Sequence, residues 1–263
     1  MRYLHALLAL AVLALAAPPQ LGAETEADAP IEDQWDALLE EHVRTVVIEG
    51  AEVNAVDYAA IKDDPRWPVL VKALETAEVP EDRDGQLAFW SNVYNILAIK
   101  VVLTDYPVNS IRDIGGWFRR VWNVDAGVVA GEMRTLHEVE HEILRELGDA
   151  RIHSAIVCAA VSCPPLRKEA FRAEVVDEQF EEQTRLWKVN PEIGARLEND
   201  GRTLRLSRIY DWFSEDYEAE ADSVLDWVRP YLSEEMKENM AESPRVRHFS
   251  YNWKLNDTAN ADE

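Results

Sequence analysis

The chain has 263 residues, enough for one large domain or two small ones, and its 50 acidic and 27 basic side chains give a formal charge of −23. Such a charge repels nucleic acids and anionic lipids, which argues against both as partners. Two cysteines are too few for a fold held together by disulfides.

Residues 1–23 have the layout of a secretory signal peptide. Arg2 precedes an apolar run from Ala6 to Ala17, and small residues surround Ala23. The run is short for a membrane span, although a retained anchor is the alternative. We therefore expect cleavage near Ala23 and a periplasmic or secreted protein without stable membrane insertion. The mature chain would carry a charge of −24, because the segment holds one basic and no acidic residue.

Helical patterns dominate the first half of the mature chain. We assign residues 24–50 to an N-terminal helical extension, because apolar residues recur at helical spacing between Trp35 and Ile48. The clearest helix follows, in "DGQLAFWSNVYNILAIKVVLTDYP". It is apolar on every side, which is typical of a buried central helix. Asn92 and Asn95 stand out within it, because buried amides need hydrogen-bond partners, either the nearby backbone or a site.

A hairpin in "RRVWNVDAGVVAGEMRTL" leads to a helix that begins at Thr135. Thr135 and Glu138 form a predicted capping box. The helix contains "HEVEH", the spacing with which two histidines, His137 and His141, bind zinc in metallopeptidases. We consider zinc unlikely here and expect no metal or cofactor, because the cap occupies Glu138 and no organised third ligand follows.

Glu140 is the informative residue of this helix. It falls in the middle of an apolar arc that contains Val139 and Ile143, whereas His137 and His141 lie at the edge of the arc or beyond it. A carboxylate that faces the core must be paired, hydrogen-bonded or neutral. It is therefore either a structural link or the group that orients a catalytic imidazole.

The segment "ARIHSAIVCAAVS" is predicted to be a buried strand that ends before "CPPL". In such a strand His153 and Cys158 face opposite sides, but Cys163 can fold back toward His153. A cysteine nucleophile needs an imidazole, and the imidazole needs an orienting group. Cys163, His153 and Glu140 can supply these roles, with Cys158 as the alternative nucleophile and His141 as the alternative base. The rival interpretation is a satisfied core histidine and two buried thiols or a local disulfide.

The C-terminal third alternates short elements. An acidic helix in "AEVVDEQFEEQTRLWKVN" precedes a strand in "RTLRLS", aromatic helices in "SRIYDWFSEDYE" and "SVLDWVRPYL", and a closing strand in "HFSYNWKL". Together the elements predict an α+β fold in which buried central helices pack on a small, mostly antiparallel sheet. The main domain spans residues 51–257, and we expect residues 258–263 to be a disordered tail.

The chain resembles the DUF547 family, a bacterial and plant domain of unknown function. The matching stretches are "LAFWSNVYNILAIKVVL", "YPVNSIRDIG", "VEHEILR", "DARIHSAIVCAAVSCPPLR", "LSRIYDWFSEDY" and "YNWKLN", which cover roughly Val56 to Asn256. The family pattern falls on Trp90, Asn92, Asn95, Glu140, His141, His153, Cys158 and Cys163. It does not call for a histidine at position 137. The resemblance implies a papain-like cysteine-peptidase fold with rearranged strand order and a Glu-His-Cys set.

Three functions are compatible with these residues. The first is an exported thiol enzyme that acts on a peptide or small-molecule amide or thioester, with Asn92, Asn95 or Trp90 supporting the site. The second is a non-catalytic module that binds a peptide or small ligand on Trp117, Trp122, Trp212 and Trp253. The third is a redox protein that cycles Cys158 and Cys163, which the spacing of the two cysteines does not favour. The oligomeric state is left open.

Overall fold

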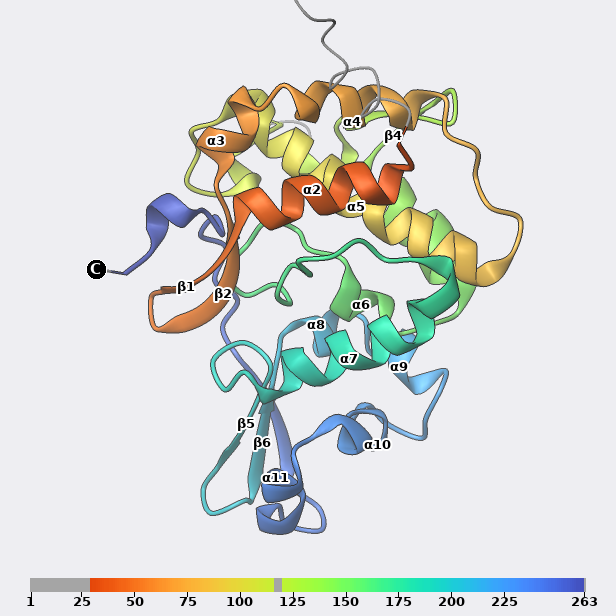
Figure 1. The fold of residues 1–263 in the computed structure, drawn as a ribbon. Helices are drawn as coiled ribbons and strands as arrows, with labels where there is room; N and C mark the ends of the chain where they lie inside the picture. The colour runs from red at the N-terminus through yellow and green to blue at the C-terminus, as the bar shows by residue number, and fades with distance from the viewer. Residues whose placement is uncertain (1–28, 116–119, 263) are drawn as a thin grey trace, which may run out of the picture.

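The computed structural model describes residues 29–115 and 120–262 (Figure 1). The segment 1–23 and Trp117 lie outside the described residues. The helices are α2 (Ile31–His42), α3 (Tyr58–Asp63), α4 (Arg66–Glu75), α5 (Arg83–Asp105), a π-helix (Glu138–Leu144), α6 (Ile152–Ala155), α7 (Val176–Val189), α8 (Ile209–Trp212), α9 (Ser214–Glu218), α10 (Val224–Val228) and α11 (Glu234–Asn239). The strands are β1 (Val43–Ile48), β2 (Ala51–Val56), β3 (Gly127–Val129), β4 (Glu132–Arg134), β5 (Ala195–Glu198), β6 (Thr203–Leu206) and β7 (Arg245–His248).

Helix α5 is the buried central helix that the sequence predicts. Asp82 caps it by accepting a 2.8 Å hydrogen bond from the backbone N–H of Gly85. The helix is long and apolar enough to cross a membrane, but 83% of its most apolar window is buried inside the molecule. Its apolar surface is therefore covered by neighbouring elements. In Figure 1 α4 lies above it and α2 crosses it in the view.

The N-terminal segment is part of the main fold. Trp35, Leu38 and Leu39 of α2 are buried in the core. The helix ends at His42 and does not continue to Ile48 as predicted, because the β-branched run from Val43 to Ile48 pairs with β2 as an antiparallel strand. Residues 29–50 are thus a helix and a strand packed into the domain.

Three small sheets confirm the α+β class. The pairs β1–β2 and β3–β4 are antiparallel, and the third sheet has the order β5–β6–β7. In that sheet β5 and β6 are antiparallel, whereas β6 and β7 are parallel. The described residues thus hold three separate sheets where the sequence predicted one. The papain-like arrangement stays a prediction.

The core has two clusters. The larger one surrounds α5 and includes Trp35 and Phe180, while the smaller one lies between β2, β6 and α8 to α10 and includes Trp187 and Tyr210. Figure 1 shows α7 between the upper helical layer and the β5–β6 end of the molecule. Tyr251 packs against both clusters and so lies where they meet.

Two predicted strands take another form. The segment that begins at Ile152 is the short helix α6 followed by extended chain, because its backbone turns back at Ala155 to hydrogen-bond Asn95. The closing strand β7 ends at His248, and the following extended chain runs beside residues 159–162. The tail is held in place: the Asp262 carboxylate accepts hydrogen bonds of 2.9 and 3.0 Å from the backbone N–H groups of Glu49 and Gly50.

Candidate functional site

A pocket of about 150 Å³ lies where the two core clusters meet. Its lining brings together Glu140, His141, His153, Cys158 and Cys163, the five residues predicted to carry catalysis. Its other lining residues are Tyr94, Trp122, His137, Ile156, Ile209, Trp212, Phe213, Tyr251 and Trp253. The site is therefore assembled from segments throughout the chain.

The predicted helix at Thr135 has an unusual form. The capping box is present: the Glu138 backbone N–H donates to the Thr135 hydroxyl at 3.1 Å, and the Thr135 backbone N–H donates to the Glu138 carboxylate at 2.8 Å. From Glu138 to Leu144 the chain is a π-helix, a rare geometry often found at functional sites. Glu140 and His141 of this π-helix and His137, the residue before it, all line the pocket.

Glu140 lies on the pocket wall without a strong ionic partner. The Tyr94 hydroxyl donates to its Oε2 at 3.3 Å. Burial raises the pKa of Glu140 to about 7, although the Tyr94 hydrogen bond and the Arg145 charge oppose the shift. The carboxyl can therefore bind or release a proton near neutral pH.

His141 is held by the turn that follows its own helix. An Arg145 guanidinium nitrogen lies 3.0 Å from His141 Nδ1. Since a guanidinium can only donate, Nδ1 accepts and the ring proton resides on Nε2. Burial, with the nearby charges of His137 and Arg145, lowers the pKa of His141 to about 4. At neutral pH this ring is an uncharged N–H donor.

His153 pairs with Asp216 and not with Glu140, which corrects the predicted Glu140–His153 link. Its Nε2 lies 2.7 Å from Asp216 Oδ2, and its ring stacks on Phe213 at 4.1 Å between centroids. Arg145 binds the same carboxylate through both oxygens, at 2.6 and 2.7 Å. Burial lowers the pKa of His153, against the effect of Asp216. Asp216 is thus the orienting group, and it leaves His153 Nδ1 as the basic nitrogen.

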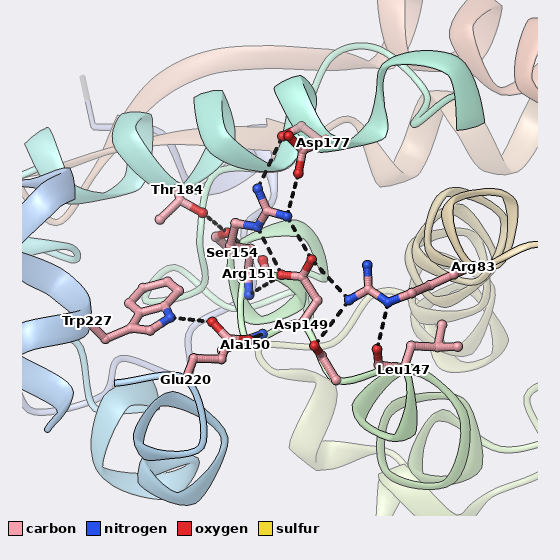
Figure 2. Close-up of polar contacts among 11 residues, drawn as sticks. Arg83, Leu147, Asp149, Ala150, Arg151, Ser154, Asp177, Thr184, Glu220 and Trp227 are labelled. Carbon is pink, nitrogen blue, oxygen red and sulfur yellow. Dashed lines mark hydrogen bonds and ion pairs between the residues drawn. The ribbon is translucent and has the colours of Figure 1, made fainter. Parts of the chain in front are cut away.

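The short helix α6, which carries His153, is anchored on both sides (Figure 2). Before it, Glu220 accepts from the backbone N–H of Ala150 at 2.6 Å and from the Trp227 indole at 2.7 Å. Arg151 joins Asp149 at 2.8 Å to Asp177 of α7 at 2.7 Å. The hydroxyl of Ser154 in α6 lies 2.7 Å from the hydroxyl of Thr184 in α7. These contacts fix the position of the imidazole relative to the pocket.

The two thiols lie together at the base of the pocket. Cys158 Sγ and Cys163 Sγ are 2.7 Å apart, and both cysteines are free. Cys163 Sγ also accepts from the Cys158 backbone N–H at 3.2 Å and lies 3.2 Å from the Tyr251 hydroxyl. Burial alone would raise the pKa of Cys163, but these hydrogen bonds lower it below the usual thiol value. The hydrogen bond to Cys163 and burial raise the pKa of Cys158. Cys163 is therefore the thiol that ionises first.

Aromatic rings form the mouth of the pocket. Trp212 is 45% exposed, stacks on Trp253 at 5.7 Å, and contacts Tyr251 at 4.8 Å between centroids. Trp122 joins these rings through its contact with Trp253, at 6.0 Å between ring centroids. Because the Tyr251 hydroxyl contacts both sulfurs, this aromatic surface is continuous with the thiols.

Three predicted binding residues lie outside the pocket lining. Asn92 exchanges two hydrogen bonds with the backbone of Phe171, at 2.8 and 2.9 Å. Asn95 donates to the Ala155 carbonyl at 3.0 Å and accepts from the Val157 N–H at 2.8 Å. Trp90 packs edge-on against Phe89. The two amides therefore hold backbone segments, and Asn95 holds the one that leads into Cys158.

The two histidines with zinc-type spacing, His137 and His141, make other contacts in the structure. The rings of His137 and His141 lie 4.5 Å apart, Glu138 is bonded to its cap, and the guanidinium of Arg145 faces His141 Nδ1. A cation at that nitrogen would meet a positive charge, so His141 Nδ1 is not available as a zinc ligand. Among the described residues, one group of possible metal ligands lies elsewhere, at Glu41, His42 and Asp64, and Arg66 already neutralises Asp64 there.

Sequence reasoning did not identify Asp216, Arg145, Tyr94 or Tyr251 as site residues. Asp216 is one of 50 acidic residues and lies 63 positions from His153, so spacing gave no signal. It does fall within "LSRIYDWFSEDY", and Tyr251 begins "YNWKLN". Those two stretches of the family resemblance were the signal that could have singled them out.

The fold and the site define an α+β protein with a dithiol at the base of an aromatic pocket. Residues 80–187 match the family model of DUF547, described as a protein of unknown function. The match contains Tyr94, Glu140, His153 and both cysteines, but it ends before Asp216 and Tyr251. No curated protein and no solved structure matches the chain.

Proposed function

We propose that the protein is an exported thiol-dependent hydrolase or acyl transferase that acts on an amide or thioester. The observation that carries the proposal is the environment of Cys163. Its sulfur accepts hydrogen bonds that favour the thiolate, at the base of a pocket that also holds an oriented imidazole.

In the proposed reaction the Cys163 thiolate attacks the substrate carbonyl. A thioester bond forms, and the bond to the amine or thiol leaving group breaks as that group takes up a proton. Water or an acceptor amine then attacks the thioester, gives up a proton, and releases Cys163. The pocket walls exclude part of the solvent from both steps.

Each remaining group has a proposed role. His153, held by Asp216 at 2.7 Å, moves the proton. His141 presents an N–H that can stabilise the oxyanion. Glu140 was predicted to orient the imidazole. Because its pKa is near 7, its proposed role is now that of a second proton carrier. Among the described residues neither sulfur hydrogen-bonds an imidazole, so the thiol and His153 must approach each other when substrate binds.

Iodoacetamide labelling between pH 4 and 9 tests the proposal. We expect Cys158→Ser to retain a thiol that reacts well below the pH of an ordinary cysteine, and Cys163→Ser to lose it. His153→Ala and His248→Ala should both leave this labelling largely unchanged, because His153 approaches the thiol only when substrate binds. Two thiols that react only at high pH would contradict the proposal and favour the non-catalytic binding module.

A second candidate is dithiol redox chemistry, which the 2.7 Å separation of the sulfurs favours. Here the Cys163 thiolate attacks a disulfide of a substrate, and Cys158 then displaces the substrate thiol. The substrate gains two electrons as the Cys158–Cys163 disulfide forms. Intact mass after titration with oxidised dithiothreitol tests it. Reversible loss of the mass of two hydrogen atoms supports it, and a dithiol that persists at every ratio counts against it.

A further inference from the structure

The described part of the pocket lining combines aromatic walls with one acidic group. Among the described residues, Glu140 is the one carboxyl in the lining, which contains neither lysine nor arginine. His141 and His153 are uncharged at neutral pH, because burial lowers the pKa of both. Among these described lining residues, ionised Glu140 therefore meets no lysine, no arginine and no protonated His141 or His153.

The cations near the pocket are already engaged. Arg145 lies in a bidentate ion pair with Asp216, at 2.6 and 2.7 Å. Arg112 stacks its guanidinium over Trp253, 5.0 Å from the ring centroid. The contact between Arg112 and Trp253 also shows that a ring of this aromatic surface accepts a cation.

The electrostatics and the shape point to the same ligand. Trp212, Trp253 and Tyr251 lie within 4.5 to 5.7 Å of one another and present electron-rich rings at the mouth. Rings of this kind bind ammonium groups, most strongly where water is excluded. A cavity of about 150 Å³ is comparable to one that holds a benzene-sized molecule. A formal charge of −23 attracts cations from solution.

We infer that the pocket recognises the ammonium group of a small organic cation, which binds between Glu140 and the Trp212–Trp253–Tyr251 wall. The inference rests on the proposed function, since it names the substrate class of the same site. In the transferase form of the reaction, an ammonium group bound here is the acceptor after it loses its proton to Glu140.

Choline and its neutral isostere 3,3-dimethyl-1-butanol separate charge from shape. Isothermal titration calorimetry on the full chain should give about tenfold tighter binding of choline. Glu140→Gln should remove most of this preference, and Trp212→Leu should weaken choline binding about threefold. Glu142→Gln, an exposed change on the same π-helix, is the matched control and should bind like the wild type.

The pH dependence identifies Glu140 as the partner of the cation. The titratable or charged groups around it are Tyr94 of α5, Arg145, Asp216 and Tyr217 of α9, the pocket histidines His137, His141 and His153, and the thiols Cys158 and Cys163. Because Glu140→Gln removes the titration of Glu140 and leaves the other groups in place, a pH dependence that this variant abolishes belongs to Glu140. Choline affinity should rise about tenfold in total as Glu140 ionises with increasing pH around 7 and level off above it, with a flat profile in Glu140→Gln.

Equal affinity for choline and the isostere, or no binding of either, would overturn the inference. The same titrations on a Cys158→Ser/Cys163→Ser double variant measure choline binding in the absence of both thiols. They therefore separate failure of the cation site from failure of the proposed thiol chemistry. Selective choline binding with unreactive thiols would leave the cation site standing without the thiol chemistry. A reactive Cys163 without choline selectivity would do the reverse.

Discussion

Glu140 and Asp216 are two carboxyl groups near Arg145 whose ionisation differs. Burial raises the pKa of both, and for Glu140 it prevails, giving a value of about 7. For Asp216 the hydrogen bonds from His153 and Arg145 outweigh burial, so its pKa falls well below the usual range. One group is therefore available for proton exchange, and the other is a fixed negative charge.

The raised pKa of Glu140 predicts that the folded protein loses stability as pH rises and this carboxyl ionises. Between its ordinary pKa of 4.5 and about 7, the folded state binds more protons than the unfolded state, so the free energy of unfolding falls as pH rises. In urea unfolding, Glu140→Gln should gain on the order of 2 kcal/mol relative to wild type between pH 5 and 8, after allowance for solvent screening. Glu142→Gln should run parallel to wild type, and parallel curves for Glu140→Gln would contradict the assignment.

Lys188 is a second ionisable residue in an unusual place. Its side chain is fully buried, its amine has no hydrogen-bond partner among the residues that the structure describes, and the rings of Trp187 and Tyr210 lie 4.0 and 4.4 Å away. Burial lowers its pKa well below the usual value. Between that lowered pKa and the ordinary one, the unfolded state binds more protons, so this group makes stability increase with pH.

Replacing Lys188 with methionine should therefore stabilise the protein. The variant removes a buried polar group without a partner, and about 1–3 kcal/mol is expected at pH 7, with the gain shrinking toward pH 10. Chemical denaturation over this pH range measures it. The exposed Lys72→Met provides the control, with a change within about 0.5 kcal/mol. A loss of stability in Lys188→Met at pH 7 would mean that the aromatic rings hold the amine as a stabilised cation.

At the level of elements, regular patterns were predictable and local departures were not. The all-round apolar helix near Asp84 and the capping box at Thr135 are local signals, and both are present in the structure. The apolar run after Arg151 predicted a strand, because periodicity cannot separate a buried strand from other buried chain. Its true shape depends on Asn95, which lies some 60 residues earlier. The π-helix has no sequence signature that would have revealed it.

The two asparagines of α5 offer a matched test of this long-range control. Each satisfies two buried backbone groups, so Asn92→Ala and Asn95→Ala should both destabilise the protein by about 2–3 kcal/mol. Asn95→Ala should also slow labelling of Cys163, because Asn95 fixes the chain just before Cys158. Asn92→Ala, which fixes Phe171, should leave the labelling rate unchanged. Equal effects on labelling would assign both residues a purely global role.

At the level of the whole molecule, the site depends on regions beyond the family match. Residues 80–187 contain the thiols, while Asp216, Tyr251 and Trp253 come from the later third of the chain. The sequence predicted the α+β class, and it predicted Glu140, His141, His153 and both cysteines as site candidates; the structure brings these five to one pocket. It wrongly predicted Glu140 as the carboxylate that orients His153, because the true pairing with Asp216 is made between α9 and α6 and not by local spacing.

The most direct test of the central claim, an acyl-transferring thiol at Cys163, is acylation by p-nitrophenyl acetate at pH 7. Intact mass and peptide mapping should find one acetyl group on Cys163 in the wild type and in Cys158→Ser. The acetyl group should turn over with time, and acylation should be much slower in His153→Ala. An unmodified protein, or acetylation confined to surface lysines, would contradict the account.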